Sequence, residues 1–323
     1  MINSILQGNN IETLKSIPSN YVNCCITSPP YYGLRNYNAE GQIGLEETPE
    51  AYIESLVIVF NEVKRILRDD GTLWVNIGDS YAGSGKGAWS NKDNQKENYI
   101  PDNNSPQCKM NKIWNGIKPK DLIGIPWMLA FALRADGWYL RQDIIWNKSN
   151  PMPESVTDRC VKAHEYLFLF SKSARYYFNN KVIQEPATTT PCIRNRINER
   201  SNIKLPGDKH RYSPGAREYT KGGLRNKRSV WTVGTEPLNF GHFAVYPQKL
   251  ILPCVLCACP ENGIILDPFM GSGTTAVVAI KNLRNYIGCE LNPDYIKITE
   301  KRIESEKGLF SFDEPPGITP VIN

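Results

Sequence analysis

The chain alternates short apolar runs with longer stretches in which apolar residues recur every three or four positions. Short runs are typical of buried strands and the longer period is typical of amphipathic helices, so the alternation predicts an α/β fold with a mainly parallel sheet. The strongest helix signal covers 49–70, with Gly71 as a stop. Strands are expected at 3–8, 22–27, 72–79, 139–146, 165–172, 263–269 and 285–290, and further helices at 11–19, at 119–134, around Leu250, from Thr274 and from Asn292.

Two long segments show no such period. Residues 82–117 are rich in Asn, Lys and Gly and predict a long mobile loop. Residues 187–230 are rich in Pro and Gly and contain eleven Lys and Arg against three Asp and Glu. This composition suits a solvated irregular insertion. It equally suits a nucleic-acid surface, in which cations neutralise phosphates while Tyr212, Tyr219 and Trp231 stack or wedge.

Composition narrows the class of protein. With 323 residues, of which 41% are hydrophobic, the chain can bury a large core and is expected to form one large domain and a smaller one. The net charge of +5 is modest. The sequence has no apolar run long enough to cross a bilayer, and its start lacks a secretory signal, so a cytoplasmic location is expected.

The cysteines predict core residues rather than disulfides or a metal site. There are nine, an odd number, scattered from Cys24 to Cys289, which argues against a disulfide framework. Cys254, Cys257 and Cys259 resemble half of a zinc site, but no second cysteine pair has metal-site spacing. These three residues lie in an apolar stretch, where a free cysteine is an ordinary small core residue.

A rigid corner follows the strand predicted at 22–27. Ser28, Pro29, Pro30 and Tyr31 come directly after it. Prolines end a strand ladder because they lack an N–H and fix φ. Such a corner can aim a backbone carbonyl with no N–H competing for it, beside a serine hydroxyl and an aromatic ring. We therefore single out the corner as a candidate site.

A glycine turn near the other end of the chain is a second candidate site. A predicted strand ends at Asp267, and Gly271 and Gly273 follow before a helix begins near Thr274. Such a turn lets a ligand approach the backbone at the carboxyl edge of a sheet. The glycines fit a dinucleotide fingerprint, with Glu290 ending the next strand, so a nicotinamide or flavin enzyme is an alternative. No lysine follows the glycines, which excludes a phosphate-binding P-loop.

The two candidate sites together resemble a known family. The stretch from Ser28 to Tyr31, SPPY, and the segment DPFMGSGTT at 267–275 resemble the catalytic and cofactor motifs of amino-methyltransferases. These are DNA methyltransferases that use S-adenosylmethionine to modify an exocyclic amine. Segments 140–153 and 242–251 resemble two further parts of the family. The order, with the catalytic motif first and the cofactor motif last, is that of its β group, and the resemblance covers roughly residues 4–306.

The resemblance implies a Rossmann-like class I methyltransferase fold, with a mainly parallel sheet in circularly permuted order. Residues 1–186 would form the catalytic half, 187–235 a basic target-recognition region, and 236–323 the cofactor-binding half. The chain would begin in the middle of the sheet and return to build the cofactor half last. The strand ends at Ile26 and Leu266 would then face one cleft at the carboxyl edge.

The resemblance also implies roles for single residues. The Pro29 carbonyl and the Ser28 hydroxyl would hold the target amine, and Tyr31 would stack on the base after it leaves the double helix. Asn9 stands where relatives usually carry an Asp that meets the adenine amine of the cofactor, and its side-chain oxygen could accept instead. Glu290 suits a ribose held through both hydroxyls, and equally a helix N-terminal charge. The implied cofactor residues are Asn9, Asp267, Pro268, Phe269, Gly271, Gly273, Thr274 and Glu290.

Five residues are implied as contacts to the base or to DNA. Trp146 and Lys148 belong to the segment that resembles the family's base pocket, although a tryptophan at a strand end is also a normal core residue. Arg225, Lys227 and Arg228 would contact phosphates or guanines. The implied partner is double-stranded DNA, with a homodimer and a cognate restriction endonuclease as further options, in a bacterial or phage-encoded enzyme.

The target base stays open between two amines. A serine at the first motif position is typical of cytosine N4 methylation, so N4 is expected, with adenine N6 as the alternative. Methylation at C5 of cytosine needs a cysteine nucleophile, and neither Cys192 nor Cys254 follows the cofactor turn in the order that chemistry uses. A DNA-binding protein that keeps the fold without catalysis is a further alternative, and the intact motifs argue against it.

Overall fold

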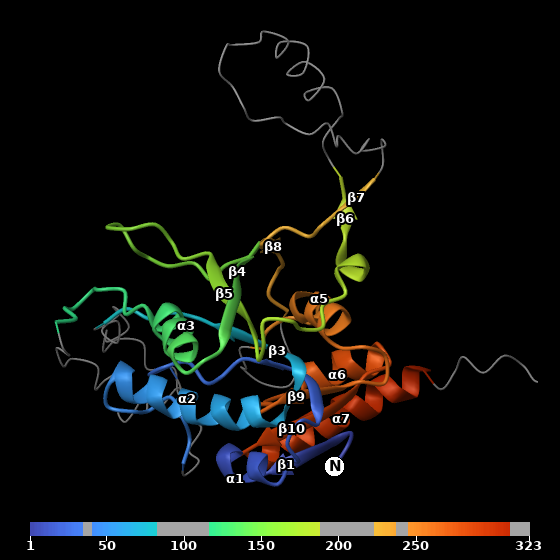
Figure 1. The fold of residues 1–323 in the computed structure, drawn as a ribbon. Helices are drawn as coiled ribbons and strands as arrows, with labels where there is room; N and C mark the ends of the chain where they lie inside the picture. The colour runs from blue at the N-terminus through green and yellow to red at the C-terminus, as the bar shows by residue number, and fades with distance from the viewer. Residues whose placement is uncertain (35–40, 83–115, 188–222, 237–244, 311–323) are drawn as a thin grey trace, which may run out of the picture. The chain divides into compact units, whose positions relative to one another are not determined.

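The computed structural model describes residues 1–34, 41–82, 116–187, 223–236 and 245–310, with side chains to 306. Two compact units are present (Figure 1). The larger comprises Met1–Phe178 and Ser229–Asn323, and the smaller comprises Asn179–Arg228. Most of the predicted loop at 82–117 and most of the basic segment at 187–230 lie outside the described residues.

The larger unit contains an eight-stranded sheet in the order β1-β10-β9-β2-β3-β5-β4-β8. Neighbouring strands are parallel, except that β5 runs antiparallel to both β3 and β4. The predicted α/β fold with a mainly parallel sheet is therefore confirmed. The strands are β1 (Ser4–Gln7), β2 (Val22–Thr27), β3 (Leu67–Ile77), β4 (Tyr139–Asn147), β5 (His164–Ser171), β8 (Val230–Thr232), β9 (Ile264–Asp267) and β10 (Asn285–Glu290).

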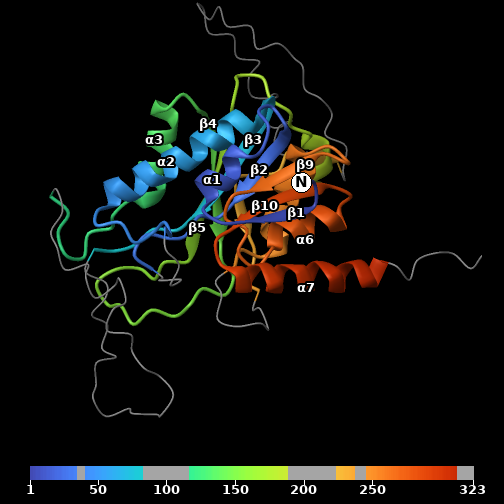
Figure 2. The same cartoon turned by 90° about the horizontal axis from the view of Figure 1, so that it is seen from below.

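Helices cover both faces of this sheet, as a mainly parallel sheet requires (Figure 2). On one face α1 (Asn10–Lys15) contacts α2 (Pro49–Ile66), which contacts α3 (Ile125–Ala135). On the other face α5 (Gln248–Ala258) contacts α6 (Thr274–Lys281), which contacts α7 (Pro293–Phe310). No helix among the described residues is long and apolar enough to cross a membrane.

The helix α2 shows how the sequence pattern builds the core. Thr48 accepts a hydrogen bond from the Ala51 N–H and caps the helix, and Pro49 occupies its first turn. Its buried stripe is Tyr52, Ile53, Leu56, Val59, Phe60, Val63 and Ile66. Burying one side chain of this size stabilises the fold by about 1.5–3 kcal/mol. The predicted core cysteines Cys254, Cys257 and Cys259 are buried in and just after α5.

The predicted boundary between the helix at 49–70 and the strand at 72–79 is wrong. The helix predicted at 49–70 ends at Ile66, because Leu67 pairs with Val22 and already belongs to β3. Gly71 is not a helix stop but lies within β3, where a Cβ would come within 2.9 Å of the Arg68 carbonyl.

The helix predicted at 119–134 begins later, at Ile125. Asp79 Oδ1 accepts hydrogen bonds from the Gly124 and Ile125 N–H groups, and Gly124 adopts a left-handed φ of 86°. Pro126, not Pro119, therefore opens the helix.

The chain does not begin in the middle of the sheet, as predicted, but at its edge. β1 pairs only with β10, so residues 1–15 lie on the side built by the C-terminal strands. The boundary of the predicted region 187–235 also differs, because Val230–Thr232 pairs with β4 and joins the large sheet. The compact smaller unit is Asn179–Arg228.

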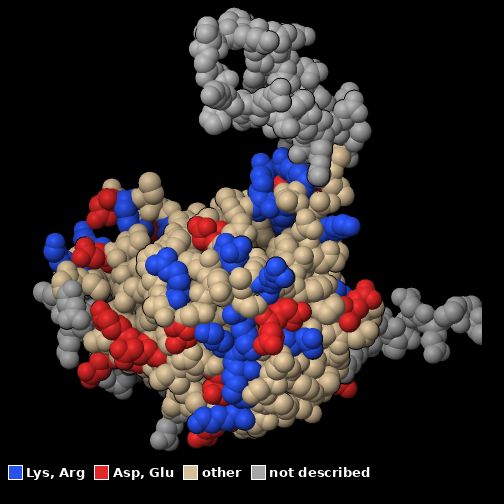
Figure 3. Space-filling view, viewed as in Figure 1, with Lys and Arg blue, Asp and Glu red and all other residues tan. Residues whose placement is uncertain are grey.

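In the smaller unit, the short strands β6 (Glu185–Pro186) and β7 (Leu224–Arg225) pair antiparallel. A single turn of 3-10 helix at Asn180–Ile183 precedes them. Lys and Arg side chains gather over the stretch between β7 and β8 (Figure 3). The part of this basic segment that the structure describes is therefore positively charged on the surface.

Candidate active site

The two sequence motifs line one cavity of about 610 Å³. Cys24 and Cys25 of β2 pair with Ile265 and Leu266 of β9, so the loops that follow these two strands leave the sheet side by side. The two motifs thus meet in one cleft, as the argument from strand ends predicts. The predicted residues that line this cavity are Asn9, Ser28, Pro29, Pro30, Tyr31, Trp146, Lys148, Pro268, Phe269, Gly271, Thr274 and Glu290.

Asp267 is fully buried and does not line the cavity. Its Oδ1 accepts hydrogen bonds from Thr27 Oγ1 at 2.6 Å and from the Phe269 N–H at 3.1 Å. Its Oδ2 accepts from Thr275 Oγ1 at 2.5 Å and from the Tyr246 hydroxyl at 3.0 Å. Burial raises the pKa of Asp267, and these hydrogen bonds oppose the rise. Asp267 therefore holds the turn through hydrogen bonds with protein groups and does not face the cavity.

The two predicted glycines have different tasks. Both adopt a left-handed φ, 54° at Gly271 and 81° at Gly273. Gly273 does not line the cavity, and a Cβ there would lie 2.2 Å from Thr299 Cγ2, so this glycine lets α7 pack against the turn. Gly271 lines the cavity, and a Cβ there would meet nothing nearer than 3.9 Å, so the backbone is open to a ligand.

Glu290 fixes the geometry of the turn from the end of β10. Its Oε2 accepts a hydrogen bond from the Gly271 N–H at 2.8 Å, and its Oε1 accepts from the Asn292 N–H at 2.8 Å. Burial raises the pKa of Glu290 to about 6, against the effect of these backbone donors. Each oxygen keeps a lone pair, so the carboxylate can also accept hydrogen bonds from hydroxyls in the cavity.

Asn9 caps the first helix and also lines the cavity. Its Oδ1 accepts a hydrogen bond from the Ile11 N–H at 2.9 Å, which is an N-cap interaction. The same amide borders the cavity together with Gly8 and Asn10. If Asn9 accepts a hydrogen bond from a ligand, its Oδ1 must therefore accept that bond in addition to the bond from the Ile11 N–H.

Contacts with Tyr52 fix the backbone of the corner at Ser28–Tyr31. The Tyr52 hydroxyl donates a 2.7 Å hydrogen bond to the Pro30 carbonyl. Tyr32 is buried and packs on Tyr52 with ring centroids 5.4 Å apart. Pro29 lines the cavity, and no described residue donates a hydrogen bond to its carbonyl. The corner thus offers this carbonyl to a ligand.

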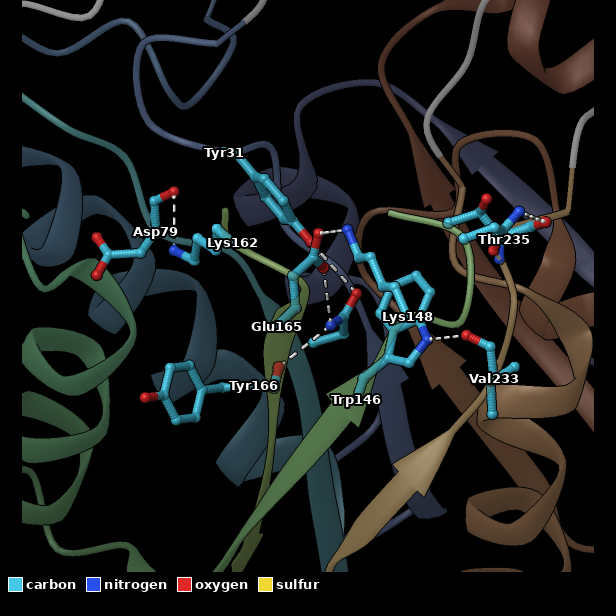
Figure 4. A network of polar contacts seen from close by, with 11 residues as sticks. Tyr31, Asp79, Trp146, Lys148, Lys162, Glu165, Tyr166, Val233 and Thr235 are labelled. Atoms are coloured by element: carbon cyan, nitrogen blue, oxygen red, sulfur yellow. Dashed lines mark hydrogen bonds and ion pairs between the residues drawn. The ribbon is translucent and has the colours of Figure 1, made fainter. Parts of the chain in front are cut away.

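Tyr31 turns its hydroxyl into a polar network at the cavity wall (Figure 4). The hydroxyl donates to Glu165 Oε2 at 2.5 Å and lies 3.3 Å from Asn76 Oδ1. Its ring packs closely over Gly78, where a Cβ would lie 2.6 Å from Tyr31 Cε2. Burial raises the pKa of Tyr31 well above its usual value, and the Glu165 charge raises it further, while a hydrogen bond with Ser28 opposes both.

Trp146 and Lys148 form another part of the cavity wall. The Trp146 indole N–H donates to the Val233 carbonyl at 2.8 Å, and the ring is 3% exposed. Lys148 Nζ lies 4.7 Å from the centre of that ring and 2.5 Å from Glu165 Oε1. Trp146 is therefore both a buried core residue and part of the cavity wall. The two interpretations from the sequence, a core residue and a base-pocket residue, are compatible.

The predicted DNA contacts Arg225, Lys227 and Arg228 belong to the smaller unit. Arg225 Nε and Arg228 Nε both lie near Glu185 Oε1, at 3.0 Å and 3.1 Å. This shared carboxylate orders the two guanidinium groups next to the β6–β7 pair. None of the three residues lines the cavity.

Several side chains that hold the site were not predicted from the sequence. Thr27 and Tyr246 hold Asp267, and Asn76 and Glu165 hold Tyr31. The signal that could have indicated them is a polar residue at the end of an otherwise apolar strand, which applies to Thr27, Asn76 and Glu165. Tyr246 lies in a segment for which the pattern suggests no such role.

Comparison with known proteins assigns a family to this site. The model of a DNA methylase family, N6_N4_Mtase, matches residues 22–301. The type II methyltransferase M.Cfr9I of Citrobacter freundii is 42% identical over 306 residues, which cover 94% of this chain and 88% of the relative. The type II methyltransferase M.SmaI of Serratia marcescens is 44% identical over 299 residues, which cover 93% of this chain and 90% of the relative.

Solved structures share the fold at lower identity. The PvuII DNA methyltransferase, described as cytosine-N4-specific, superposes with a TM-score of 0.61 at 16% identity and covers 96% of this chain and 92% of its own. A putative DNA modification methylase of Thermus thermophilus, solved in complex with S-adenosyl-L-methionine, has a TM-score of 0.55 at 22% identity, with 94% and 95% covered. These two likenesses concern the fold alone.

Proposed function

This chain belongs to the N6/N4 family of DNA methylases, and from that premise we propose that it transfers a methyl group from S-adenosylmethionine to the exocyclic N4 amine of cytosine in a specific DNA sequence. The fold proposed for it is a Rossmann-like class I methyltransferase in circularly permuted order. The observed strand order supports this, since the strand that leads to Ser28 lies between strands from opposite ends of the chain.

One observation carries the proposal. The corner at Ser28–Tyr31 and the glycine turn at 268–274 line the same cavity, although more than half of the chain separates them. A methyl transfer needs its donor and its acceptor in contact and in line, and holding two reactants in this way can lower the barrier by about 7–11 kcal/mol. A cavity walled by both motifs provides this arrangement.

The residues on the cofactor side fit S-adenosylmethionine. Gly271 leaves the backbone open to a ligand, and Glu290 presents a carboxylate whose orientation two backbone N–H groups fix. Glu290 would accept from the ribose hydroxyls, Asn9 would meet the adenine amine, and Phe269 would contact the adenine ring. When bound, S-adenosylmethionine supplies a sulfonium methyl group that a nucleophile can displace. Asp267 and Gly273 would act indirectly, by holding the turn.

The residues on the catalytic side fit an exocyclic amine. The lone pair of such an amine is delocalised into the base, so it is a poor nucleophile. The Pro29 carbonyl and the Ser28 hydroxyl would each accept one N–H of the amine and draw the nitrogen towards a tetrahedral geometry. Pro30 would keep the Pro29 carbonyl in place. The Tyr52 hydroxyl donates a 2.7 Å hydrogen bond to the Pro30 carbonyl and so fixes the backbone next to Pro29.

The walls of the cavity fit a base that has left the double helix. Tyr31 would stack on the base, and Trp146 and Lys148, which line the same cavity, would also border it. Extrusion of a base costs a few kcal/mol, which contacts of this kind offset. Ser28 favours cytosine N4 as the target, and adenine N6 stays the alternative.

Recognition of the DNA sequence is proposed for the basic region at 187–235. Arg225, Lys227 and Arg228 are its described candidates for phosphate or guanine contacts. Double-stranded DNA is the proposed substrate, and a second copy of the chain and a cognate restriction endonuclease are proposed partners.

Methyl transfer to defined DNA tests the proposal. Unmethylated plasmid DNA is incubated with the protein and tritiated S-adenosylmethionine, and the modified positions are mapped by sequencing that detects methylated bases. Label at one short recurring sequence supports the proposal. Cofactor binding by calorimetry without label in any DNA would overturn it in favour of a binding protein that has lost catalysis.

A further inference from the structure

Glu165 joins the two walls of the base cavity through its two carboxylate oxygens. Oε2 accepts the Tyr31 hydroxyl at 2.5 Å and lies 3.3 Å from Asn76 Nδ2, whereas Oε1 pairs with Lys148 Nζ at 2.5 Å (Figure 4). Tyr31 follows β2, Asn76 is near the end of β3, and Lys148 follows β4. One carboxylate of β5 thus contacts side chains that lie in or just after three other strands of the sheet.

The direction of β5 explains why this carboxylate is at the site. The strands β2, β3 and β4 all end at the edge where the cavity lies, whereas β5 runs the opposite way and begins there. Glu165 is the second residue of β5 and pairs with Trp146, and Leu167–Ser171 behind it are all buried. The only charged residue of β5 is therefore placed at the cavity edge.

The pair of Glu165 and Lys148 is largely withdrawn from water. The Glu165 side chain is 13% exposed and the Lys148 side chain is 21% exposed. A charge in such a setting interacts more strongly with its neighbours than it would in water, and removing one member of the pair leaves the other uncompensated. Both residues also line the cavity that contains the Ser28–Tyr31 corner.

The charge of Lys148 matters for the proposed chemistry. As the amine nitrogen bonds to the methyl carbon and the carbon–sulfur bond breaks, the positive charge would move from the sulfonium to the nitrogen, which would then release one of its protons to water. An uncompensated ammonium group in the same cavity would oppose this development and raise the barrier. The Glu165 carboxylate compensates the ammonium charge and so lowers this electrostatic repulsion. The remaining N–H groups of Lys148 can still donate hydrogen bonds to the base.

We infer that Glu165 is a positioning residue that compensates the charge of Lys148 and orients Tyr31 beside the target amine. This inference rests on the proposed function and adds a specific role for a residue outside both motifs. The substrate side of the cavity is then a neutral Lys–Glu pair facing a neutral base.

Three variants separate charge compensation from simple packing. Glu165→Gln keeps the size of the side chain and an oxygen for the Tyr31 hydroxyl, but removes the charge that faces Lys148. Lys148→Met removes the ammonium, and the double variant removes both charges. Single-turnover methyl transfer to DNA that contains the mapped site gives the rate of the chemical step.

The inference predicts a rescue. Glu165→Gln should slow the chemical step by about tenfold or more, because it leaves an unpaired positive charge beside the amine. The double variant Glu165→Gln with Lys148→Met should react faster than Glu165→Gln alone and close to the rate of Lys148→Met. A double variant as slow as Glu165→Gln, or slower, would overturn the inference, since charge compensation requires that removing the second charge restores the rate of the chemical step.

Controls separate this inference from the function on which it rests. Cofactor affinity by calorimetry should stay unchanged in all three variants, because the inference assigns Glu165 and Lys148 to the base and not to the cofactor. Glu62→Gln, which removes the remote pair with Arg65 on α2, should react at the wild-type rate. Active wild-type protein with an equally active Glu165→Gln variant would overturn the inference alone. Wild-type protein that labels no DNA would overturn the proposed function and the inference together.

Discussion

Thr27 Oγ1 donates a 2.6 Å hydrogen bond to Asp267 Oδ1, which joins the last residue of β2 to the last residue of β9. Both side chains are buried. Ser28 follows one of them and Pro268 follows the other, so this contact sets the spacing between the corner and the glycine turn. The hydrogen bond between Thr27 and Asp267 therefore links the positions of the two motifs.

The coupling predicts a loss of both stability and cofactor affinity in Asp267→Asn. The amide has N–H donors where three hydroxyls and a backbone N–H need acceptors, so at least one buried donor loses its partner. We expect the free energy of unfolding to fall by about 1–3 kcal/mol. Urea denaturation measures this loss, and calorimetry measures the expected weaker binding of S-adenosylmethionine. Asp294→Asn, at an exposed ion pair with Lys297, is the matched control and should change neither.

The glycine turn predicts a steric effect at Gly273. Gly273→Ala should destabilise the protein more than Gly116→Ala does. Both glycines have a left-handed φ, 81° and 89°, so both substitutions incur backbone strain of about 1 kcal/mol. Only at Gly273 does the added methyl meet another residue, 2.2 Å from Thr299 Cγ2, whereas nothing lies within 4 Å at Gly116. Equal shifts of the denaturation midpoint for the two variants would contradict the role assigned to this glycine.

The raised pKa of Glu290 predicts that cofactor affinity depends on pH. Burial raises this pKa to about 6, so the carboxyl group is protonated below that pH and ionised above it. Ribose hydroxyls donate better to a carboxylate than to a carboxylic acid. The affinity for S-adenosylmethionine should therefore be constant well above pH 6 and fall as the pH drops through about 6. Calorimetry between pH 5 and pH 8 measures this. Glu290→Gln should bind weakly and without that pH dependence, and an unchanged pH profile in the variant would contradict the assignment.

Tyr31 should act mainly through its ring. Tyr31→Phe keeps the ring and loses the hydrogen bond to Glu165, whereas Tyr31→Ala loses both. Stacking of a base on an aromatic side chain contributes about 1–3 kcal/mol, so Tyr31→Ala should lower kcat/KM by about 10- to 100-fold. Tyr31→Phe should lose several-fold less. Equal losses in the two variants would show that the ring does not hold the base.

Local pattern was sufficient for most elements and for both motifs. The strands at 22–27 and 285–290 match β2 and β10 without change, and the helix from Thr274 matches α6. Where a predicted element boundary differs from the structure, contacts between residues far apart in the sequence set the observed boundary. The helix α2 ends at Ile66 because Leu67 pairs with Val22, which no local signal indicates.

The same distinction holds within the site. The predicted Ser28, Pro29 and Gly271 line the cavity because the motif itself carries their geometry. Glu165 belongs to neither motif, and its role depends on β5 running antiparallel between β3 and β4. Asp267 was predicted to bind the cofactor directly, and the structure instead surrounds it with protein donors.

The most direct test of the account identifies the methylated nucleoside. DNA labelled by the wild-type protein and by Ser28→Ala is digested to nucleosides and analysed by mass spectrometry. The account predicts N4-methylcytosine from the wild-type protein and a rate lower by about 10- to 100-fold from Ser28→Ala, because the amine loses one of its two acceptors. N6-methyladenine would leave the fold and the amine chemistry in place but correct the base assigned from Ser28. Full activity in Ser28→Ala would contradict the proposed mechanism.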